Sequence, residues 1–84
     1  MTSLEKMQTL IDIQKRGNIA KITMLDGDSI LCKLHNPAED EEDWAYDVVT
    51  IEANPKHYTL ECGFIKSIEE LTIGIYDEIN RVAG

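Results

Sequence analysis

The sequence of 84 residues lacks several features that define large classes of protein. No apolar run approaches the roughly 20 residues that a membrane-spanning helix needs, and the N-terminus lacks the apolar segment of a signal peptide. The glycines lie apart from one another, so there is no glycine-rich loop to hold phosphates, and no catalytic motif is present. We therefore expect a non-enzymatic, cytoplasmic protein that forms one domain over residues 1–84.

Basic residues are scarce: eight Lys and Arg side chains stand against sixteen Asp and Glu, which sets the formal net charge at −8. Affinity for nucleic acid comes largely from Lys and Arg contacts to phosphates, so this balance disfavours nucleic acid as a partner. The charge is also uneven, because residues 1–38 carry five basic and four acidic groups whereas residues 39–84 carry three and twelve. We expect the second half of the chain to present an acidic, solvated surface.

Cysteine and histidine are rare as well, with two of each. Zinc accepts both residue types, and a zinc-binding domain is one alternative for this chain, with the candidate ligands Cys32, His35, His57 and Cys62. Side chains at odd separations in a strand point to opposite faces, however, which separates each cysteine from the nearer histidine. We expect the cysteines to be buried as small hydrophobic residues, and we expect no metal or other cofactor.

A β-hairpin is the clearest local pattern, and it covers residues 19–36. Two β-rich runs are joined by Asp26-Gly27, a pair typical of a type I′ turn because glycine adopts positive φ at no steric cost. Alternation along the two runs puts two apolar sets on one face, namely Ala20, Ile22 and Met24 beside Ile30, Cys32 and Leu34. This two-stranded apolar surface needs cover from the rest of the chain.

A helix predicted over residues 3–16 provides part of that cover. Its apolar residues follow helical spacing and define one stripe, made of Leu4, Met7, Leu10 and Ile11, with Ile13 off the stripe. Thr2 and Glu5 have the spacing of a capping box, and Gly17 is placed to end the helix in the left-handed conformation. A helix of this length is marginal alone in water, so we expect it to dock on the sheet.

The second half of the chain has the pattern of short strands separated by polar segments. Pro37 is expected to end the second strand, because proline interrupts interior strands, and the acidic run over residues 39–43 is expected to form a loop. Three more strands are predicted, over residues 44–53, 57–61 and 64–68. A helix is expected over residues 75–82, and whether residues 67–83 as a whole form strand or helix stays open. The predicted fold class is mainly β: an N-terminal helix and a small five-stranded barrel.

This order of elements resembles that of the Sm and LSm proteins, small SH3-like barrels with an N-terminal helix. The resemblance spans residues 3–71, and its best match is the segment Ile22-Thr-Met-Leu-Asp-Gly-Asp-Ser-Ile-Leu-Cys-Lys-Leu34, which is similar to the family's first hairpin. It implies a barrel that assembles into rings, and it keeps RNA binding as an alternative function. The family's Asp-x-x-Asn nucleotide-binding motif is absent after the second strand, and Cys62-Gly63 stands where the family has Arg-Gly. We therefore transfer no RNA-binding residue.

Three aromatic residues indicate where a partner would bind. Trp44 and Tyr46 are two residues apart beside the acidic run, so they would project from one side of a strand and could hold a basic or proline-rich segment. Burial of this pair in the core is the alternative. Tyr58 lies in a strand with few charges to protect its edge from pairing with another copy. We predict a small non-enzymatic interaction module that forms a homo-oligomer, with a dimer favoured over a ring.

Overall fold

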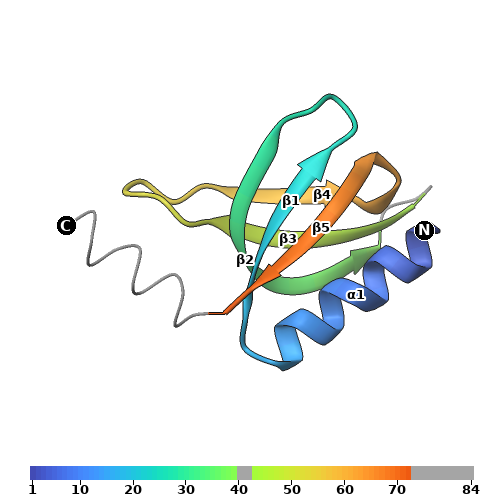
Figure 1. Ribbon diagram of the computed structural model, residues 1–84, viewed down its shortest axis with the longest axis horizontal. Coiled ribbons are helices and arrows are strands. Elements are labelled where there is room, and N and C mark those ends of the chain that lie inside the picture. Colours follow the sequence, from blue (N-terminus) through green and yellow to red (C-terminus); the bar gives the residue numbers. More distant parts are fainter. Residues whose placement is uncertain (40–42, 73–84) are drawn as a thin grey trace.

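The computed structural model describes residues 1–39 and 43–72 (Figure 1). In chain order the elements are α1 (Ser3–Lys15), β1 (Ile19–Met24), β2 (Ser29–Glu39), β3 (Trp44–Thr50), β4 (His57–Glu61), the 3₁₀ turn η1 (Cys62–Phe64) and β5 (Ile65–Leu71). The predicted fold class, mainly β with an N-terminal helix and five strands, is confirmed. The helix predicted over residues 75–82 lies outside the described residues. Within those residues, no helix has the length and apolar character needed to cross a membrane.

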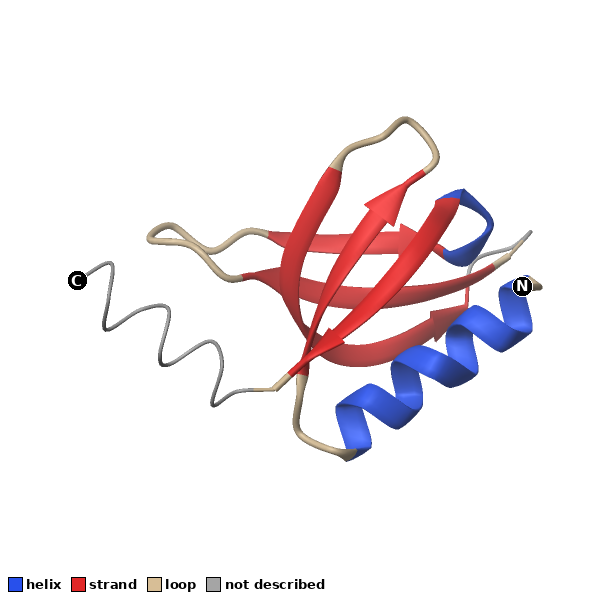
Figure 2. Cartoon of the chain, viewed as in Figure 1, coloured by secondary structure: helices blue, strands red, loops and turns tan. Residues whose placement is uncertain are grey.

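All five strands form one antiparallel sheet in the order β4-β3-β2-β1-β5. Its two edge strands, β4 and β5, follow each other in the chain with only η1 between them. A flat sheet would separate those edges by about 19 Å, whereas the four steps from Glu61 to Ile65 span at most about 14 Å. The sheet must therefore curl until its edges approach at η1, and Figure 2 shows β5 crossing over the strands β3 and β4.

The helix α1 closes the core by packing against β2, β3 and η1. The predicted capping box of Thr2 and Glu5 is confirmed, and Gly17 follows the helix with φ of +72°. The predicted stripe was wrong at two positions, because Leu4 is exposed and Ile13 is buried. At about 100° per residue, Met7 and Ile13 lie about 60° on either side of Leu10, whereas Leu4 lies about 120° away. Docking of the helix centred on Leu10 therefore buries Ile13 and leaves Leu4 in solvent.

The hairpin of β1 and β2 has the predicted register, with Ala20 opposite Cys32 and Ile22 opposite Ile30. Its turn differs from the predicted type I′, because Gly27, at +95°, has the only positive φ in the described part of this turn. The N–H of Gly27 donates to the carbonyl of Met24, and the N–H of Met24 donates to the carbonyl of Asp28. This is a three-residue loop with one left-handed glycine, which joins strands without requiring positive φ at Asp26.

The strand β2 continues through Pro37 to Glu39, contrary to the prediction that proline would end it. The pairing of β2 with β1 stops at Lys33, so β2 has only β3 as a neighbour when it reaches Pro37. A residue without an N–H is tolerated there because the open side needs no donor. A register shift at His35 precedes this extension, and Gln14 of α1 donates its amide N–H to the His35 carbonyl.

Two side chains hold η1 in place. Lys6 of α1 donates from Nζ to the carbonyls of Cys62, at 3.2 Å, and Ile65, at 2.6 Å. Asp43 accepts the N–H of Gly63 at 2.6 Å, and this bond lowers the pKa of the Asp43 carboxyl. A Cβ at Gly63 would lie 2.6 Å from Asp43 Oδ2, so only glycine fits at this position without a shift of Asp43. The corner between the sheet edges is thus tied both to α1 and to the start of β3.

The end of α1 is tied to β5 by a charged contact. Arg16 donates from Nε and Nη2 to the two carboxylate oxygens of Glu70, at 2.8 and 2.7 Å, and Asn18 donates to the same carboxylate. The Arg16 hydrogen bonds, followed by the Asn18 bond, lower the pKa of Glu70 to about 2. The predicted fifth strand extends to Leu71, where it pairs with Ile19.

Replacing Lys6 by methionine tests the tie between α1 and η1. Lys6→Met keeps the length of the aliphatic chain but removes both hydrogen bonds, so we expect the free energy of unfolding to fall by about 1.5–3 kcal/mol. Urea denaturation followed by circular dichroism measures this change. The matched control is Lys15→Met in the exposed last turn of the same helix, for which we expect a change of only a few tenths of a kcal/mol. Equal losses in both variants would contradict the assigned role of Lys6.

The contact between Arg16 and Glu70 should make stability depend on pH. Because folding lowers the pKa of Glu70, its contribution is fully present above the ordinary value of 4.5 and is lost as the pH falls toward about 2. We expect Glu70→Gln to lower the melting temperature at neutral pH and the difference from wild type to vanish across that acidic range. Thermal melts at a series of pH values measure it, and a difference that is constant with pH would contradict the charged contact.

Candidate functional site

Trp44 and Tyr46 were predicted to project together beside the acidic run, but only one of them is accessible in the structure. Tyr46 is completely buried, and its hydroxyl donates to the side-chain oxygen of Gln14, so its ring is part of the core. Trp44, at the start of β3, is 39% exposed. Tyr58 of β4 is exposed to a similar extent, 41%. Of the three predicted partner-binding residues, Trp44 and Tyr58 are therefore accessible, and they lie on different strands.

Both cysteines are free and fully buried in the core, Cys32 on the inner face of β2 and Cys62 in η1. Burial raises the pKa of the Cys32 thiol to about 12. Burial also raises the pKa of Cys62, and the nearby Asp43 carboxylate adds to that effect. A thiol with a raised pKa stays protonated at neutral pH and is a poor nucleophile and a poor metal ligand. The two cysteines act here as small hydrophobic residues.

The two histidines meet on the outer face of the sheet. The rings of His35, on β2, and His57, on β4, have centroids 6.0 Å apart at an angle of 88°, which is an edge-to-face contact. They line a small hollow together with Asp47, whose carboxylate accepts a hydrogen bond from Thr59 at 2.7 Å. Within residues 1–39 and 43–72, no three His, Cys, Asp or Glu side chains are grouped so that they could hold a metal ion. The sheet itself separates the cysteines from the histidines.

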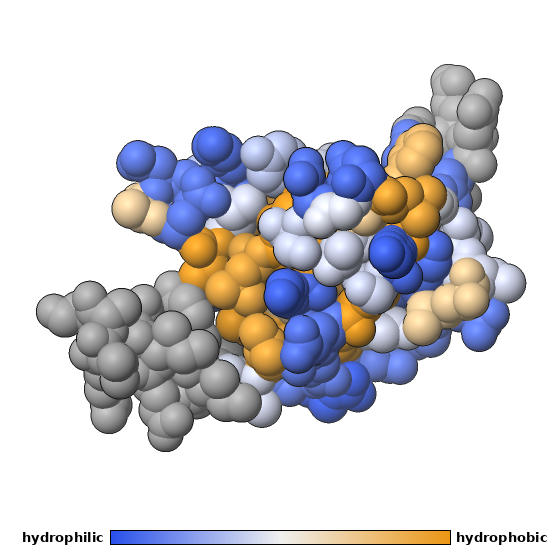
Figure 3. Space-filling view, turned by 45° about the horizontal axis from the view of Figure 1, so that its top comes forward, coloured by the Kyte–Doolittle hydropathy of each residue, from blue (hydrophilic) through white to orange (hydrophobic). Residues whose placement is uncertain are grey.

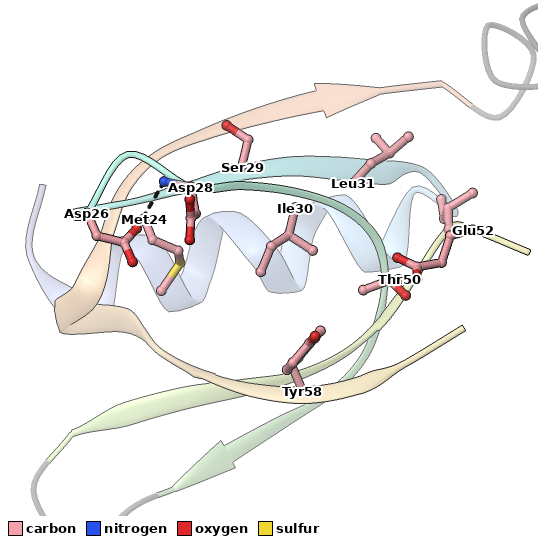
Figure 4. Close-up of a pocket in the computed structure, with 10 residues that line it drawn as sticks. Met24, Asp26, Asp28, Ser29, Ile30, Leu31, Thr50, Glu52 and Tyr58 are labelled. Carbon is pink, nitrogen blue, oxygen red and sulfur yellow. Dashed lines mark hydrogen bonds between the residues drawn. The ribbon is translucent and has the colours of Figure 1, made fainter. Parts of the chain in front are cut away.

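Two accessible features lie where the curled sheet stays open, between β4 and the hairpin. One of them, which we name the mouth hollow, has a volume of about 610 Å³. Its lining residues are Met24, Asp26, Asp28, Ser29, Ile30, Leu31, Thr50, Ile51, Glu52 and Tyr58. Figure 4 shows the side chains of Ile30 and Tyr58 pointing toward each other across the hollow, with Met24 and Asp28 on one side of Ile30. The hollow thus has an apolar centre and carboxylates at its ends.

A second accessible feature, the edge groove, runs beside β4 and has a volume of about 670 Å³. It is lined by Met24, Leu25, Asp26, Thr59, Leu60, Glu61 and Phe64. Leu25 and Phe64 are 60% and 56% exposed, so two large apolar side chains lie in solvent at the same groove. The space-filling view in Figure 3 shows hydrophobic residues exposed between hydrophilic ones on one face of the molecule.

Sequence reasoning identified Tyr58 but missed both of these surfaces. A signal for the edge groove was present in Leu25, an apolar residue inside a turn where polar residues are the rule. No comparable signal exists for the mouth hollow, because Glu52 and Asp28 are far apart in the chain. They line one cavity only through the pairing of β2 with β3.

The buried cysteines give a direct test of the inner face. We expect both thiols of the folded protein to react with a water-soluble disulfide reagent at least about a hundredfold more slowly than in urea, because burial keeps them protonated and inaccessible. Absorbance of the released thiolate measures the rates. Rapid reaction of either cysteine in the folded protein would contradict its burial.

Comparison of this chain with protein-family models, with curated proteins and with solved structures finds no match. The candidate sites are therefore argued from geometry and chemistry. Two candidate sites, the edge groove and the mouth hollow, are large enough to hold part of a partner and are lined by both apolar and polar side chains.

Proposed function

We propose that this protein is a non-enzymatic interaction module that assembles with copies of itself through the edge strand β4. The observation that carries the proposal is an edge strand with accessible residues beside an exposed apolar groove. His57, Tyr58 and Thr59 are exposed along β4, and the edge groove runs along the same strand. An edge strand presents unpaired N–H and C=O groups, which another strand can satisfy.

The other edge strand, β5, is better protected against pairing. Its exposed residues include Lys66, Glu69 and Glu70, and charged side chains along an edge oppose the approach of a second strand. In β4 the last residue, Glu61, is the only Asp, Glu, Lys or Arg. The two edges therefore differ, and the difference favours association through β4.

Antiparallel pairing of β4 with β4 of a second copy gives a closed two-fold dimer, because the same residues face each other on both sides. With Thr59 at the centre of such a pair, Tyr58 of one copy lies opposite Leu60 of the other, an aromatic-aliphatic cross-strand contact. Association also covers apolar surface, such as Leu25 and Phe64, that a chain of this size cannot bury alone.

The resemblance to the Sm and LSm proteins supports self-association, since ring assembly is a habit of that family. The helix and the five-stranded antiparallel sheet are compatible with this resemblance. The absence of the family's Asp-x-x-Asn motif, together with the net charge of −8, favours a protein partner over RNA. A dimer is favoured over a ring because a two-fold contact uses β4 alone.

Sedimentation equilibrium over a wide range of protein concentration tests this proposal. We expect a reversible dimer that strengthens as salt rises, because salt screens the repulsion between two acidic chains. Tyr58→Asp and Leu25→Asp are each expected to raise the dimer dissociation constant about tenfold or more, since covering one apolar side chain contributes roughly 1.5–3 kcal/mol.

The matched control is Trp44→Asp, which places the same charge on an aromatic residue of similar exposure on β3, outside the edge groove. We expect it to leave the dimer unchanged. A monomer under all conditions, or an assembly that Trp44→Asp disrupts and Tyr58→Asp does not, would overturn the proposed interface. Binding of short RNA that weakens as salt rises would instead favour the RNA-binding alternative.

A further inference from the structure

We infer that the mouth hollow binds an extended basic segment of a partner protein. This segment has one Lys or Arg side chain on each side of an apolar residue. The inference rests on the proposed role of this chain as an interaction module. The mouth hollow shares Met24, Asp26 and Tyr58 with the surface proposed for self-association, whereas Asp28 and Glu52 line the hollow and not the edge groove. Three observations support it: the shape of the mouth hollow, the charges at its ends and its apolar centre.

The lining of the mouth hollow follows the start of β2, from Asp28 through Ile30 to Leu31. Asp28 immediately precedes this strand, and Thr50 lies opposite Cys32, four residues further along. At about 3.3 Å per residue, Thr50 therefore lies about 13 Å along β2 from Asp28. An extended peptide covers the same distance in four residues, so its side chains at positions i and i+4 can reach the two ends.

Carboxylates mark both ends of the mouth hollow. Asp26 and Asp28 lie at the hairpin turn, where Asp26 Oδ1 accepts the backbone N–H of Asp28 at 2.9 Å, and Glu52 lies at the other end beside Thr50 (Figure 4). Among the described residues, none of these three carboxylates has an ion-pair partner, and no basic side chain lines the hollow. A cationic ligand would therefore find three carboxylates that are not already paired.

The centre of the mouth hollow is apolar and aromatic. Ile30 and Tyr58 face each other across it, and Met24 lies next to Ile30 (Figure 4). The aliphatic stems of Lys and Arg pack on such surfaces while their charged ends stay polar, and Arg also stacks on an aromatic ring. The apolar centre suits the stems and one apolar residue between them. The sequence pattern that fits the hollow has five residues. The first and the fifth are Arg or Lys, and the third is apolar.

A fluorescent peptide with the central sequence Arg-Ala-Ile-Ala-Arg tests this inference on the full chain. We expect saturable binding by fluorescence anisotropy, with shifts in the methyl NMR signals of Met24 and Ile30. Asp28→Asn and Glu52→Gln are each expected to weaken binding about five- to tenfold, since each removes one charged contact. The same peptide with citrulline in place of both arginines is expected to bind at least tenfold more weakly.

The matched control variant is Glu69→Gln, which removes the same charge from an exposed position on β5 outside the hollow. We expect it to change binding less than twofold. Equal weakening by Glu69→Gln and Glu52→Gln would show attraction to the net charge alone and would overturn the inference, as would undiminished binding of the citrulline peptide. Equally tight binding of spermidine would assign the hollow to a free polyamine instead of a protein segment.

Sedimentation equilibrium of Asp28→Asn and Glu52→Gln separates this inference from the proposed self-association. We expect both variants to associate as the wild type does, because neither residue lines the edge groove. Loss of peptide binding with intact association supports a binding site that depends on Asp28 and Glu52 and not on self-association. Intact peptide binding in a chain that stays monomeric would overturn the proposed self-association and leave the assignment of the hollow standing.

Discussion

The short link between β4 and β5 is the constraint on which the rest of this structure depends. These strands are the opposite edges of the sheet, and only Cys62–Phe64 separates them in the chain. The sheet has to curl to bring them together, and the curl encloses a core that α1 then covers. Lys6 and Asp43 hold this corner by bonding the polar backbone of the link. Burial of Cys62 and Ile65 beside it is a consequence of the same geometry.

The curl is complete at one corner and incomplete along β4, and this asymmetry creates both candidate surfaces. Where the edges meet, backbone groups are bonded, and Cys62 and Ile65 are buried while Phe64 stays exposed. Where the edges diverge, the mouth hollow opens between the hairpin and β4. Two of the scarce basic residues are used in contacts within the chain. Lys6 donates to the backbone of η1 and β5, and Arg16 pairs with Glu70 of β5. Within the part of the chain that the structure describes, the carboxylates at the mouth hollow have no ion-pair partner, and the hollow is therefore acidic.

Much of the candidate site could not be predicted because it is built from residues far apart in the chain. Period-two alternation correctly placed Cys32 inward, since that rule concerns one strand. Tyr46 could not be assigned from its spacing to Trp44, because its burial depends on Gln14 reaching it from α1. The mouth hollow needs Asp28 and Glu52 together, and only the pairing of β2 with β3 brings them there.

The sequence by itself determined the helix with its capping box, the register of the first hairpin and the number of strands, because caps, glycine turns and alternating side chains act over a few residues. Only the tertiary structure decided that β2 continues through Pro37, where the absence of a β1 neighbour makes a missing N–H harmless. It also decided that Ile13 and not Leu4 faces the core, since the docking angle of α1 is set by the curled sheet. These outcomes depend on which surfaces meet, and local preferences carry no information about that.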